Sequence, residues 1–390
     1  MSLASGSVGN ALTAGPKLGS FRQRSHLDWR VPIFAMNSPI IWMNSGRCGT
    51  LPNRPTRMSL FSELDAAGTT VSDSIWFRYR MRWKRRRLIR RALARRHELS
   101  RVSVDEARIE AARFPRYVTL RNEYARLPNF LAHYRALGVD HFLIVDNGSD
   151  DGSAEYLEKQ PDVSLWSTLA SYKNARFGMD WNTCLQFRFG SGKWVLTVDA
   201  DELLILPHGR KLPELVQHLD ATGRDSFGAL MLDLYPEGPV GTGSFDAGDD
   251  PLAVLQWFDA PAYRARRHPV FDNLWIQGGP RARIFFKDEP NRAPALNKTP
   301  LVKWDRRYAF VSSTHMLLPR GLNLVYDEWG GEKASGILLH TKFLDTFTSK
   351  AREELERKQH YADGQEYKSY VAELENQPEL WCKWSEKYFN

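Results

Sequence analysis

The sequence predicts an α/β fold, because short apolar runs alternate with amphipathic helical patterns along the chain. The clearest run covers residues 194–198 and leads directly into Asp199, Asp201 and Glu202. Ligands of open α/β sheets bind beyond the carboxyl ends of the strands. Carboxylate oxygens at such an edge suit a divalent cation. With 390 residues, of which 42% are hydrophobic, the chain can bury one sizeable core.

The first strand–helix unit is predicted upstream of these carboxylates. Residues 117–120 have the pattern of a short strand, and residues 121–123 follow where a loop to a helix is expected. Gly138 fits the C-terminal cap of that helix. The helix itself is indicated by apolar residues at three- and four-residue spacing, namely Leu127, Phe130, Leu131, Tyr134 and Leu137.

The same alternation continues to the carboxylates. Residues 141–145 form a strand pattern, and the polar loop 146–153 supplies capping residues for a helix near residues 154–159. A short strand around 163–166, a helical stretch from about 177 to 189 and the strand ending at Asp199 follow. Strands separated by helices predict a parallel sheet.

Beyond Glu202 the pattern is less regular. Residues 228–235 have the pattern of a strand, and the loop 236–251 is long enough for an acceptor-side loop or a lid. In residues 277–283, two glycines permit close backbone approach, and Arg281 and Arg283 at alternate positions could clamp phosphate from one strand face. The alternative is a β-turn followed by an edge strand with solvated arginines.

The N-terminal part differs from the rest in composition. Residues 1–74 are rich in Ser, Gly, Pro and Arg without a clear period, so they are expected to lack a packed core. Eleven of the 54 Lys and Arg residues lie between Arg78 and Arg96 with no acid among them, so the remainder has 43 basic and 46 acidic residues. Aromatic and aliphatic residues interleave these charges, which predicts that residues 76–96 bind an anionic membrane surface.

Two other interpretations of this basic segment remain. It could be a solvated basic helix packed on the domain. It could also be a nucleic-acid-binding arm, but no other part of the chain supports base recognition, so a nucleic-acid partner is not expected. The three cysteines, Cys48, Cys184 and Cys382, lack paired or metal-type spacing, which indicates a reducing compartment. No run approaches transmembrane length. We therefore expect a cytoplasmic protein, peripherally attached to the inner face of the plasma membrane.

Other nucleotide-binding patterns fail on specific residues. Residues 190–193 resemble part of a P-loop, but Trp194 replaces the required Ser or Thr and Phe187 occupies the first glycine position. The glycine pair 241–243 has Asp246 where a dinucleotide fingerprint needs a third glycine. A sugar nucleotidyltransferase would need a glycine-rich loop after the first strand, and residues 121–126 contain no glycine.

Three segments in this order resemble the nucleotide-binding half of family 2-like glycosyltransferases with the GT-A fold: residues 121–123, 145–152 and 198–202. Residues 137–142 and 339–343 are similar to a bacterial subgroup of surface polysaccharide synthesis. The resemblance covers roughly Arg80 to the C-terminus. It implies a GT-A type, Rossmann-like mixed sheet flanked by helices, with a basic N-terminal helix and a C-terminal helical tail. The expected organisation is an extension at 1–74, a basic amphipathic helical segment at 75–112, the GT-A domain at 113–345 and the tail at 346–390.

The resemblance also implies an activity. The expected enzyme moves a sugar from a nucleotide-sugar donor to a glycan or lipid-linked acceptor, with a Mn²⁺ or Mg²⁺ ion that stabilises the leaving diphosphate. In the family, the residue matching Asp146 contacts the nucleoside, and the pair matching Asp199 and Asp201 carries the metal and the diphosphate. Asp201 is the first choice for direct ligation, Asp199 is expected to bridge to the ribose or to water, and Glu202 is a weaker candidate. The predicted donor-binding residues are Arg121, Asn122, Glu123, Asp146, Asn147, Asp199, Arg281, Arg283 and Lys342.

A late histidine and a base complete the expected site. Enzymes with this fold often return a histidine to the metal, and His340 is preferred over His315 because Lys342 follows it and could reach the same diphosphate. The alternative for His340 is a satisfied core side chain. Asp272 is the predicted base, with Asp233 and Glu237 as the other acids at plausible distance. The alternative function is a nucleic-acid- or membrane-binding protein whose GT-A-like domain is not catalytic.

Overall fold

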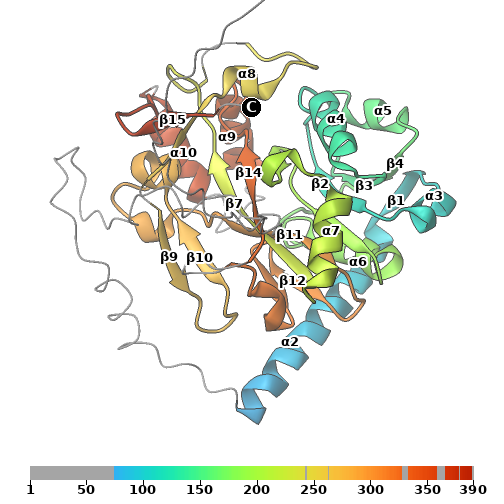
Figure 1. Cartoon of the computed structure of the whole chain (residues 1–390). Helices are drawn as coiled ribbons and strands as arrows, with labels where there is room; N and C mark the ends of the chain where they lie inside the picture. The colour runs from blue at the N-terminus through green and yellow to red at the C-terminus, as the bar shows by residue number, and fades with distance from the viewer. Residues whose placement is uncertain are drawn as a thin grey trace, which may run out of the picture.

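The computed structural model of the protein describes residues 74–241, 244–261, 263–326, 333–357, 365–376 and 378–388. The predicted extension at residues 1–74 lies outside this part of the chain, apart from Ser74. The described residues form a central sheet with helices on both faces, from which one helix projects (Figure 1).

The central sheet is mixed, as the resemblance implied. Its strand order is β1-β4-β3-β2-β5-β11-β7-β14-β6. Strands β2, β3, β4 and β5 pair in parallel, as the alternation of strands and helices predicted, and β14 is parallel to β7. The remaining pairs are antiparallel. The strands are β1 (Ser100–Ser103), β2 (Pro115–Leu120), β3 (His141–Asp146), β4 (Val163–Ser167), β5 (Trp194–Thr197), β6 (Glu202–Ile205), β7 (Ser226–Asp233), β11 (Asn297–Lys303) and β14 (Ser335–His340).

Strand alternation places a hydrophobic cluster on each face of the sheet. In β2, Val118 packs into one cluster and Tyr117 into the other, because successive side chains point to opposite faces. The first cluster is covered by α4 (Leu127–Leu137), α5 (Ser153–Glu158) and α7 (Leu212–Ala221), and the second by α3 (Glu106–Ala111) and α6 (Met179–Phe189).

The predicted strands and helices of the first half are confirmed to within a few residues. Helix α4 covers the predicted stretch, and Gly138 caps it in the left-handed region at φ 109°. Helix α6 begins at Met179 instead of about 177, because Gly178 at φ 75° precedes it. The purely parallel alternation ends at β5, which pairs with β11 in antiparallel orientation.

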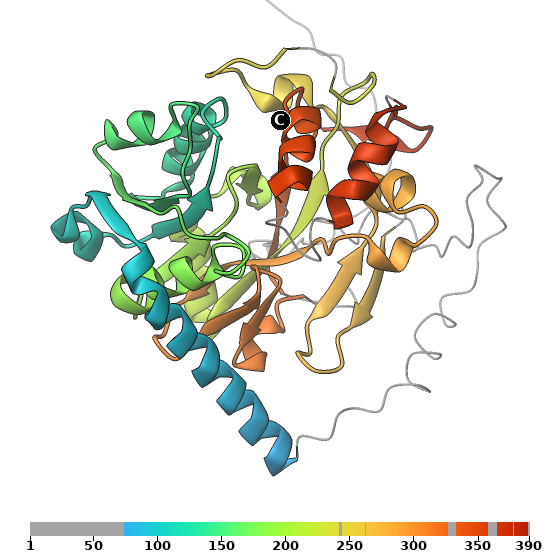
Figure 2. The same cartoon turned by 180° about the vertical axis from the view of Figure 1, so that it is seen from behind.

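The second half of the chain completes the sheet and adds three two-stranded ribbons. These pair β9 (Arg264–Arg267) with β10 (Leu274–Gln277), β12 (Ala309–Ser312) with β13 (Met316–Leu318), and β8 (Trp257–Asp259) with β15 (Ser385–Lys387). Helices α9 (Phe347–Arg357) and α10 (Gln365–Leu374) bring Phe347 and Tyr370 against the core (Figure 2). Shorter elements are α8 (Pro251–Val254), η1 (Arg95–Glu98), η2 (Pro207–Gly209), η4 (Pro290–Arg292) and η5 (Arg320–Asn323).

Residues 277–283 differ from both sequence interpretations. Arg281 and Arg283 do not lie on a strand but in a short π-helix, η3 (Arg281–Phe285). Strand β10 ends at Gln277, and Pro280, which has no N–H to donate to a strand ladder, starts the helical turn at φ −62°. The two arginines therefore do not share one strand face.

The basic segment forms helix α2 (Ile75–Ala94), and Ser74 caps it by accepting the Phe77 N–H at 3.1 Å. Its C-terminal half packs along α6, while its N-terminal half projects from the body (Figures 1 and 2). Strand β1, which follows, joins the edge of the central sheet. Among the described helices, none combines the length and apolarity that a membrane span requires.

Candidate active site

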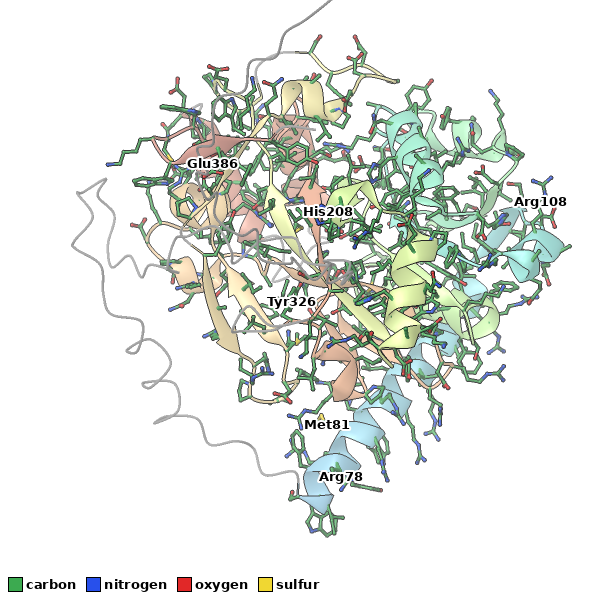
Figure 3. All side chains as sticks on the ribbon, in the orientation of Figure 1. Arg78, Met81, Arg108, His208, Tyr326 and Glu386 are labelled. Carbon is green, nitrogen blue, oxygen red and sulfur yellow. The ribbon has the colours of Figure 1, made fainter. Side chains whose placement is uncertain are left out.

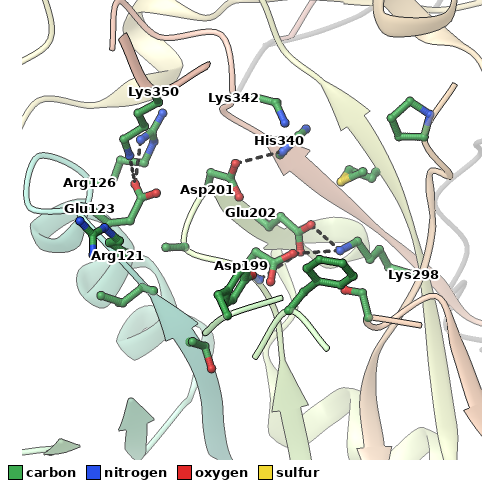
Figure 4. Close-up of a pocket in the computed structure, with 18 of the residues that line it drawn as sticks. Arg121, Glu123, Arg126, Asp199, Asp201, Glu202, Lys298, His340, Lys342 and Lys350 are labelled. Carbon is green, nitrogen blue, oxygen red and sulfur yellow. Dashed lines mark hydrogen bonds and ion pairs between the residues drawn. The ribbon is translucent and has the colours of Figure 1, made fainter. Parts of the chain in front are cut away.

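A cavity of about 380 Å³ opens where the two halves of the sheet meet. Its walls come from the loop after β2, the turn between β5 and β6, strands β11 and β14, and helix α9 (Figure 4). Acidic and basic side chains line it together. The acids are Glu123, Asp199, Asp201, Glu202 and Glu353; the bases are Arg121, Arg126, Arg281, Lys298, Lys342 and Lys350, with His315 and His340.

The turn that carries Asp199 and Asp201 is held by backbone contacts from distant residues. The guanidinium of Arg116 is buried, stacks 3.5 Å from the Phe130 ring centre, and donates to the carbonyls of Val198 (3.1 Å) and Asp199 (3.3 Å). Thr341, just after β14, donates its N–H to the Asp201 carbonyl at 2.8 Å. Because the backbone is tied on both sides, the carboxylates are presented to the cavity from a fixed turn.

Lys298 on β11 is the cation nearest to the first carboxylate. Its ammonium lies 3.1 Å from Asp199 Oδ2 and 2.8 Å from Glu202 Oε1, and its side chain is only 4% exposed. Burial alone would lower the pKa of Lys298, but Asp199 and Glu202 outweigh burial and raise it. Burial raises the pKa of Glu202 although Lys298 opposes the change. The sequence analysis did not select Lys298; its signal is a lysine within an otherwise buried strand.

His340 is the partner of the second carboxylate. Its Nε2 lies 3.1 Å from Asp201 Oδ2, and its Nδ1 lies 2.6 Å from Asp233 Oδ1. The strand register explains this placement, because His340 on β14 pairs with Glu202 of β6 on one side and Asp233 of β7 on the other. Arg281 then donates to Asp233 Oδ2 at 2.7 Å. The result is a continuous series of contacts from the partly exposed Asp201 through the buried His340 and Asp233 to the buried Arg281.

Opposing electrostatic effects act on the ionisable groups that link Asp201 to Arg281. Burial disfavours charge on both partners, but mutual attraction outweighs it: the pKa of Asp201 falls well below its usual value, chiefly through His340, and the pKa of His340 rises through Asp201 and Asp233. The pKa of Asp233 is also lowered, because Arg281 and His340 outweigh burial. The structure thus favours ionised carboxylates at this wall of the cavity.

The loop after β2 supplies a second charged group. Glu123 accepts from Arg126 at 2.8 Å and lies 2.8 Å from the Lys350 ammonium of α9. Arg121 donates to the Asn147 carbonyl at 3.2 Å and lies 3.6 Å from Glu353. Asn122 adopts a left-handed φ of 52°. These three predicted residues, together with Asn147 and Lys342, all line the cavity.

Asp146 has a structural task in the same loop. Its Oδ2 accepts the N–H groups of Gly148 and Ser149, each at 3.1 Å, and its Oδ1 accepts the Ser149 hydroxyl. Asp146 is buried and is not among the cavity-lining residues. Its neighbour Asn147 lines the cavity instead and is fixed by donating to the carbonyls of Thr168 and Ala170.

Two further predicted residues stand apart from the cavity. Arg283 pairs with Asp259 at 3.0 Å and donates to the Leu380 carbonyl, which ties η3 to the C-terminal segment. Asp272 lies in the β9–β10 turn, 3.1 Å from Arg267 and 3.7 Å from Arg320. Neither residue lines the cavity. The structure therefore gives no support to Asp272 as the base.

His315 lines the cavity, and no carboxylate among the described residues is hydrogen-bonded to its ring. Its Nδ1 donates to the Asn297 carbonyl at 2.6 Å. Burial, with Lys298 adding to it, lowers the pKa of His315 to about 3, so the ring is neutral. The two histidines thus differ in their contacts: His340 contacts Asp201 of the turn, whereas His315 contacts a backbone carbonyl.

The residues around Asp201 fit a divalent cation that shares its ligands with a substrate. The described residues contain no cluster of three or more His, Cys, Asp or Glu side chains arranged to hold a metal. However, an imidazole nitrogen and a carboxylate oxygen converge within 3.1 Å, and Asp233 orients the imidazole from its other nitrogen, as second-shell carboxylates do. Magnesium sites commonly use one or two protein ligands and take the others from phosphates and water. Asp201 supplies such a carboxylate, and the Nε2 of His340 beside it could add a nitrogen ligand in its neutral form.

Comparisons with known proteins identify the family of part of this chain. Residues 117–237, which include the loop after β2 and the carboxylate turn, match the family described as "Glycosyl transferase family 2". No curated protein matches the chain. Two solved structures from Acinetobacter baumannii are similar to it: "UTP-bound UGPase" (10% identity, TM-score 0.28, covering 67% of this chain and 99% of that one) and "UDP-glucose pyrophosphorylase" (11%, 0.26, 66% and 99%). The family match shows that residues 117–237 are a glycosyl transferase family 2 domain and that the protein is a nucleotide-sugar-dependent glycosyltransferase.

Proposed function

We propose that this glycosyltransferase is metal-dependent and that it transfers a sugar to a glycan or lipid-linked acceptor in bacterial surface polysaccharide synthesis. The observation that supports metal dependence is the convergence of Asp201 and His340 in a cavity that Asp199 also lines. The acceptor class follows the resemblance of residues 137–142 and 339–343 described above.

In this proposal, Asp201 and His340 hold a Mn²⁺ or Mg²⁺ ion, and Asp199 faces the ribose or a metal-bound water. When bound, the ion neutralises charge that develops on the leaving diphosphate. Asp233 keeps the imidazole of His340 oriented by accepting its Nδ1–H. Lys298 holds one oxygen of Asp199, so the other oxygen is the one presented to the donor.

Protein cations add to this neutralisation. Lys342, Arg126 and Lys350 lie on the same side of the cavity as Asp201 and Glu123 (Figure 4). Arg126 also donates to the Thr341 carbonyl at 3.2 Å, which couples it to the end of β14. Fixed cations around a leaving diphosphate stabilise its charge without rearranging as the reaction proceeds.

A thermal-shift screen tests the donor and the metal together. UDP-, GDP-, CMP- and dTDP-sugars are added with and without Mn²⁺, because a ligand that binds only the folded state raises its melting temperature. We expect one nucleotide series to raise the melting temperature, and to do so more strongly with Mn²⁺. The same shift in chelator contradicts metal dependence. A shift with nucleic acid and with none of the sugar nucleotides supports the alternative of a non-catalytic nucleic-acid-binding protein.

We propose further that α2 attaches the enzyme to an anionic membrane surface. Its projecting half exposes Trp76 (77%), Tyr79 (54%) and Trp83 (51%), which recur at three- and four-residue spacing on one face. Exposed aromatic rings among arginines suit the headgroup region of a membrane. Part of α2 instead packs as a basic helix on the domain, because Arg91 pairs with Asp180 of α6 at 2.8 Å and donates to the Asn174 carbonyl at 2.6 Å.

Vesicle co-sedimentation across a salt series tests this attachment. Replacement of five arginines between Arg78 and Arg91 with Gln should release the protein from anionic vesicles, because each basic residue near such a surface contributes about 1 kcal/mol. Binding that is equally strong in this variant, or insensitive to salt, contradicts the attachment. Glycosyl transfer to a soluble acceptor should be retained.

A further inference from the structure

A groove lies between the projecting half of α2 and the end of β13. It has a volume of about 370 Å³. Helix α2 contributes Arg78, Arg82 and Arg85, and Arg320 faces them from the start of η5. The other lining residues are apolar: Phe77, Met81, Leu318 and Pro319. None of the residues that line the groove is acidic. We call this feature the arginine groove.

The spacing of the helix residues makes the groove a single surface. Arg78, Arg82 and Arg85 recur at four- and three-residue intervals, so they lie one above the other on one side of an α-helix. Met81, between them, packs on the cluster of Phe271, Met316 and Leu318. Figure 3 shows Arg78 and Met81 on the part of α2 that projects from the body.

Three of the four arginines of the groove have no carboxylate partner among the described residues. These are Arg78, Arg82 and Arg85. Arg320 lies 3.7 Å from Asp272, which also pairs with Arg267, and its guanidinium is 5.0 Å from the Phe77 ring centre. Burial, followed by the neighbouring charges of Arg307, Arg82 and Arg86, lowers the pKa of Arg85, and the opposing charge of Asp305 does not outweigh them. An anion in the groove would relieve this repulsion.

We propose that the arginine groove binds the phosphate headgroup of an anionic phospholipid. Guanidinium groups bind phosphate oxygens in bidentate geometry, which accounts for the arginines. The apolar floor accounts for the lipid, because Met81, Leu318 and Pro319 offer contact to the glycerol and the first acyl carbons. Ile75, 82% exposed at the tip of the same helix, extends this apolar surface outward.

The groove would also place the membrane near the catalytic cavity. Strand β13 joins the two, since His315 just before it lines the cavity and Leu318 at its end lines the groove. Three residues of extended chain span about 10 Å. A headgroup held in the groove therefore orients the cavity toward a lipid-linked acceptor. This inference deepens the membrane attachment proposed above by naming its lipid and its binding residues.

A matched pair of variants tests the groove. The groove variant replaces Arg78, Arg82 and Arg85 with Gln. The control variant replaces Arg80, Arg87 and Arg90 with Gln; these residues are exposed on the same helix and do not line the groove. Both variants lose three charges, so a general attraction to a charged surface predicts equal effects. Both are compared with the unchanged protein in co-sedimentation with phosphatidylcholine vesicles, with and without phosphatidylglycerol.

We expect the groove variant to bind phosphatidylglycerol vesicles at least about tenfold more weakly than the control variant. Equal losses in the two variants overturn the groove and leave the general attachment of α2 standing. No loss in either variant overturns both. If the triple groove variant does not fold, the single substitutions Arg82→Gln and Arg87→Gln provide the same comparison, with the same order of affinities expected.

Soluble ligands then identify the occupant. Short-chain phosphatidylglycerol below its micelle concentration should raise the melting temperature of the unchanged protein and the control variant but not of the groove variant. Short-chain phosphatidylcholine and inorganic phosphate should have no such effect. An equal shift with inorganic phosphate overturns the lipid in favour of a free-anion site. A larger shift with a short oligonucleotide overturns it in favour of nucleic acid.

Discussion

The acids and the cations of the active-site cavity come from differently organised parts of the sequence. Asp199, Asp201 and Glu202 lie within four consecutive residues at the end of one strand. Their cationic partners come from far along the chain, Lys298 from β11 and His340 from β14. The acids depend on local sequence, whereas each cation depends on a strand register. The site is therefore an acidic turn whose charge is balanced only after the second half of the sheet has formed.

The largest effect should follow from changing the acid that meets His340. Asp201→Asn removes one charge at nearly constant shape, and we expect turnover to fall by at least about a thousandfold, because an interaction with developing transition-state charge is lost. Asp199→Asn should be nearly as severe. The measurement is sugar transfer with and without Mn²⁺, with the melting temperature as the control for folding. Full activity in either variant would contradict the assignment of the metal to this turn.

A substitution of Lys298 tests whether the cations of the cavity stabilise the fold, in contrast to the acids, which are expected to serve the activity. Lys298→Met leaves Asp199 and the buried Glu202 without their partner, and we expect a loss of about 3–5 kcal/mol in the free energy of unfolding. Urea denaturation measures this loss. Lys303→Met on the same strand is the control, because Lys303 pairs with Asp220 at an exposed position and should cost at most about 1 kcal/mol. Similar losses in the two variants would show that Lys298 is not a buried counter-ion.

The two histidines sharpen the comparison further. His340→Ala should weaken Mn²⁺ binding by at least about tenfold, because His340 contacts Asp201 directly. His315→Ala should change it by less than about threefold, because His315 donates to a backbone carbonyl instead. Manganese titrations of the two variants in the presence of donor give the answer. Small and equal effects on Mn²⁺ binding would show that both histidines serve only packing.

The smallest effect concerns the acid sensitivity of the fold. The pKa of His315 is about 3 in the folded state against 6.5 for an unperturbed histidine. Below pH 6.5 the imidazole of His315 binds a proton in the unfolded chain but stays neutral in the folded protein. The stability contributed by neutral His315 is therefore lost as the pH falls from 6.5 toward 3. His315→Gln removes this group, and its free energy of unfolding should decline less steeply between pH 6.5 and 4.5. Parallel declines in urea denaturation would contradict the assignment.

The sequence was most informative where contacts are local. Helix α4 was predicted because its apolar residues follow the helical period, and Gly138 ends it because it adopts a left-handed φ. The acids of the turn were recognised for the same reason, since strand β5 and its carboxyl end are contiguous. The loop residues 121–123 also reached the cavity as expected, because a short βα loop cannot lie far from the strand it follows.

The positions of side chains that depend on tertiary contacts were harder to predict. Asp146 carries a carboxylate at a strand end, but its own loop supplies the N–H and hydroxyl donors that occupy it. Arg283 was grouped with Arg281 by spacing, and the π-helix separated them, so that one contacts Asp233 and the other Asp259. Asp272 was chosen from its distance along the chain, and the β9–β10 ribbon holds it near Arg267 and Arg320 instead.

By itself, the sequence determined the α/β alternation of the first half, the acidic turn at residues 199–202 and the basic helix, because periodicity and strand-end chemistry need only neighbouring residues. The tertiary structure alone decided which cations meet those acids. Lys298 and His340 are placed by antiparallel and parallel pairing between β11, β7, β14 and β6. The contact that results between His340 and Asp201 joins residues 139 positions apart. No local sequence pattern encodes such a pairing. The strand register is fixed by the burial of both faces of the sheet, and the charged side chains that become buried are stable only when this register pairs them with opposite charges.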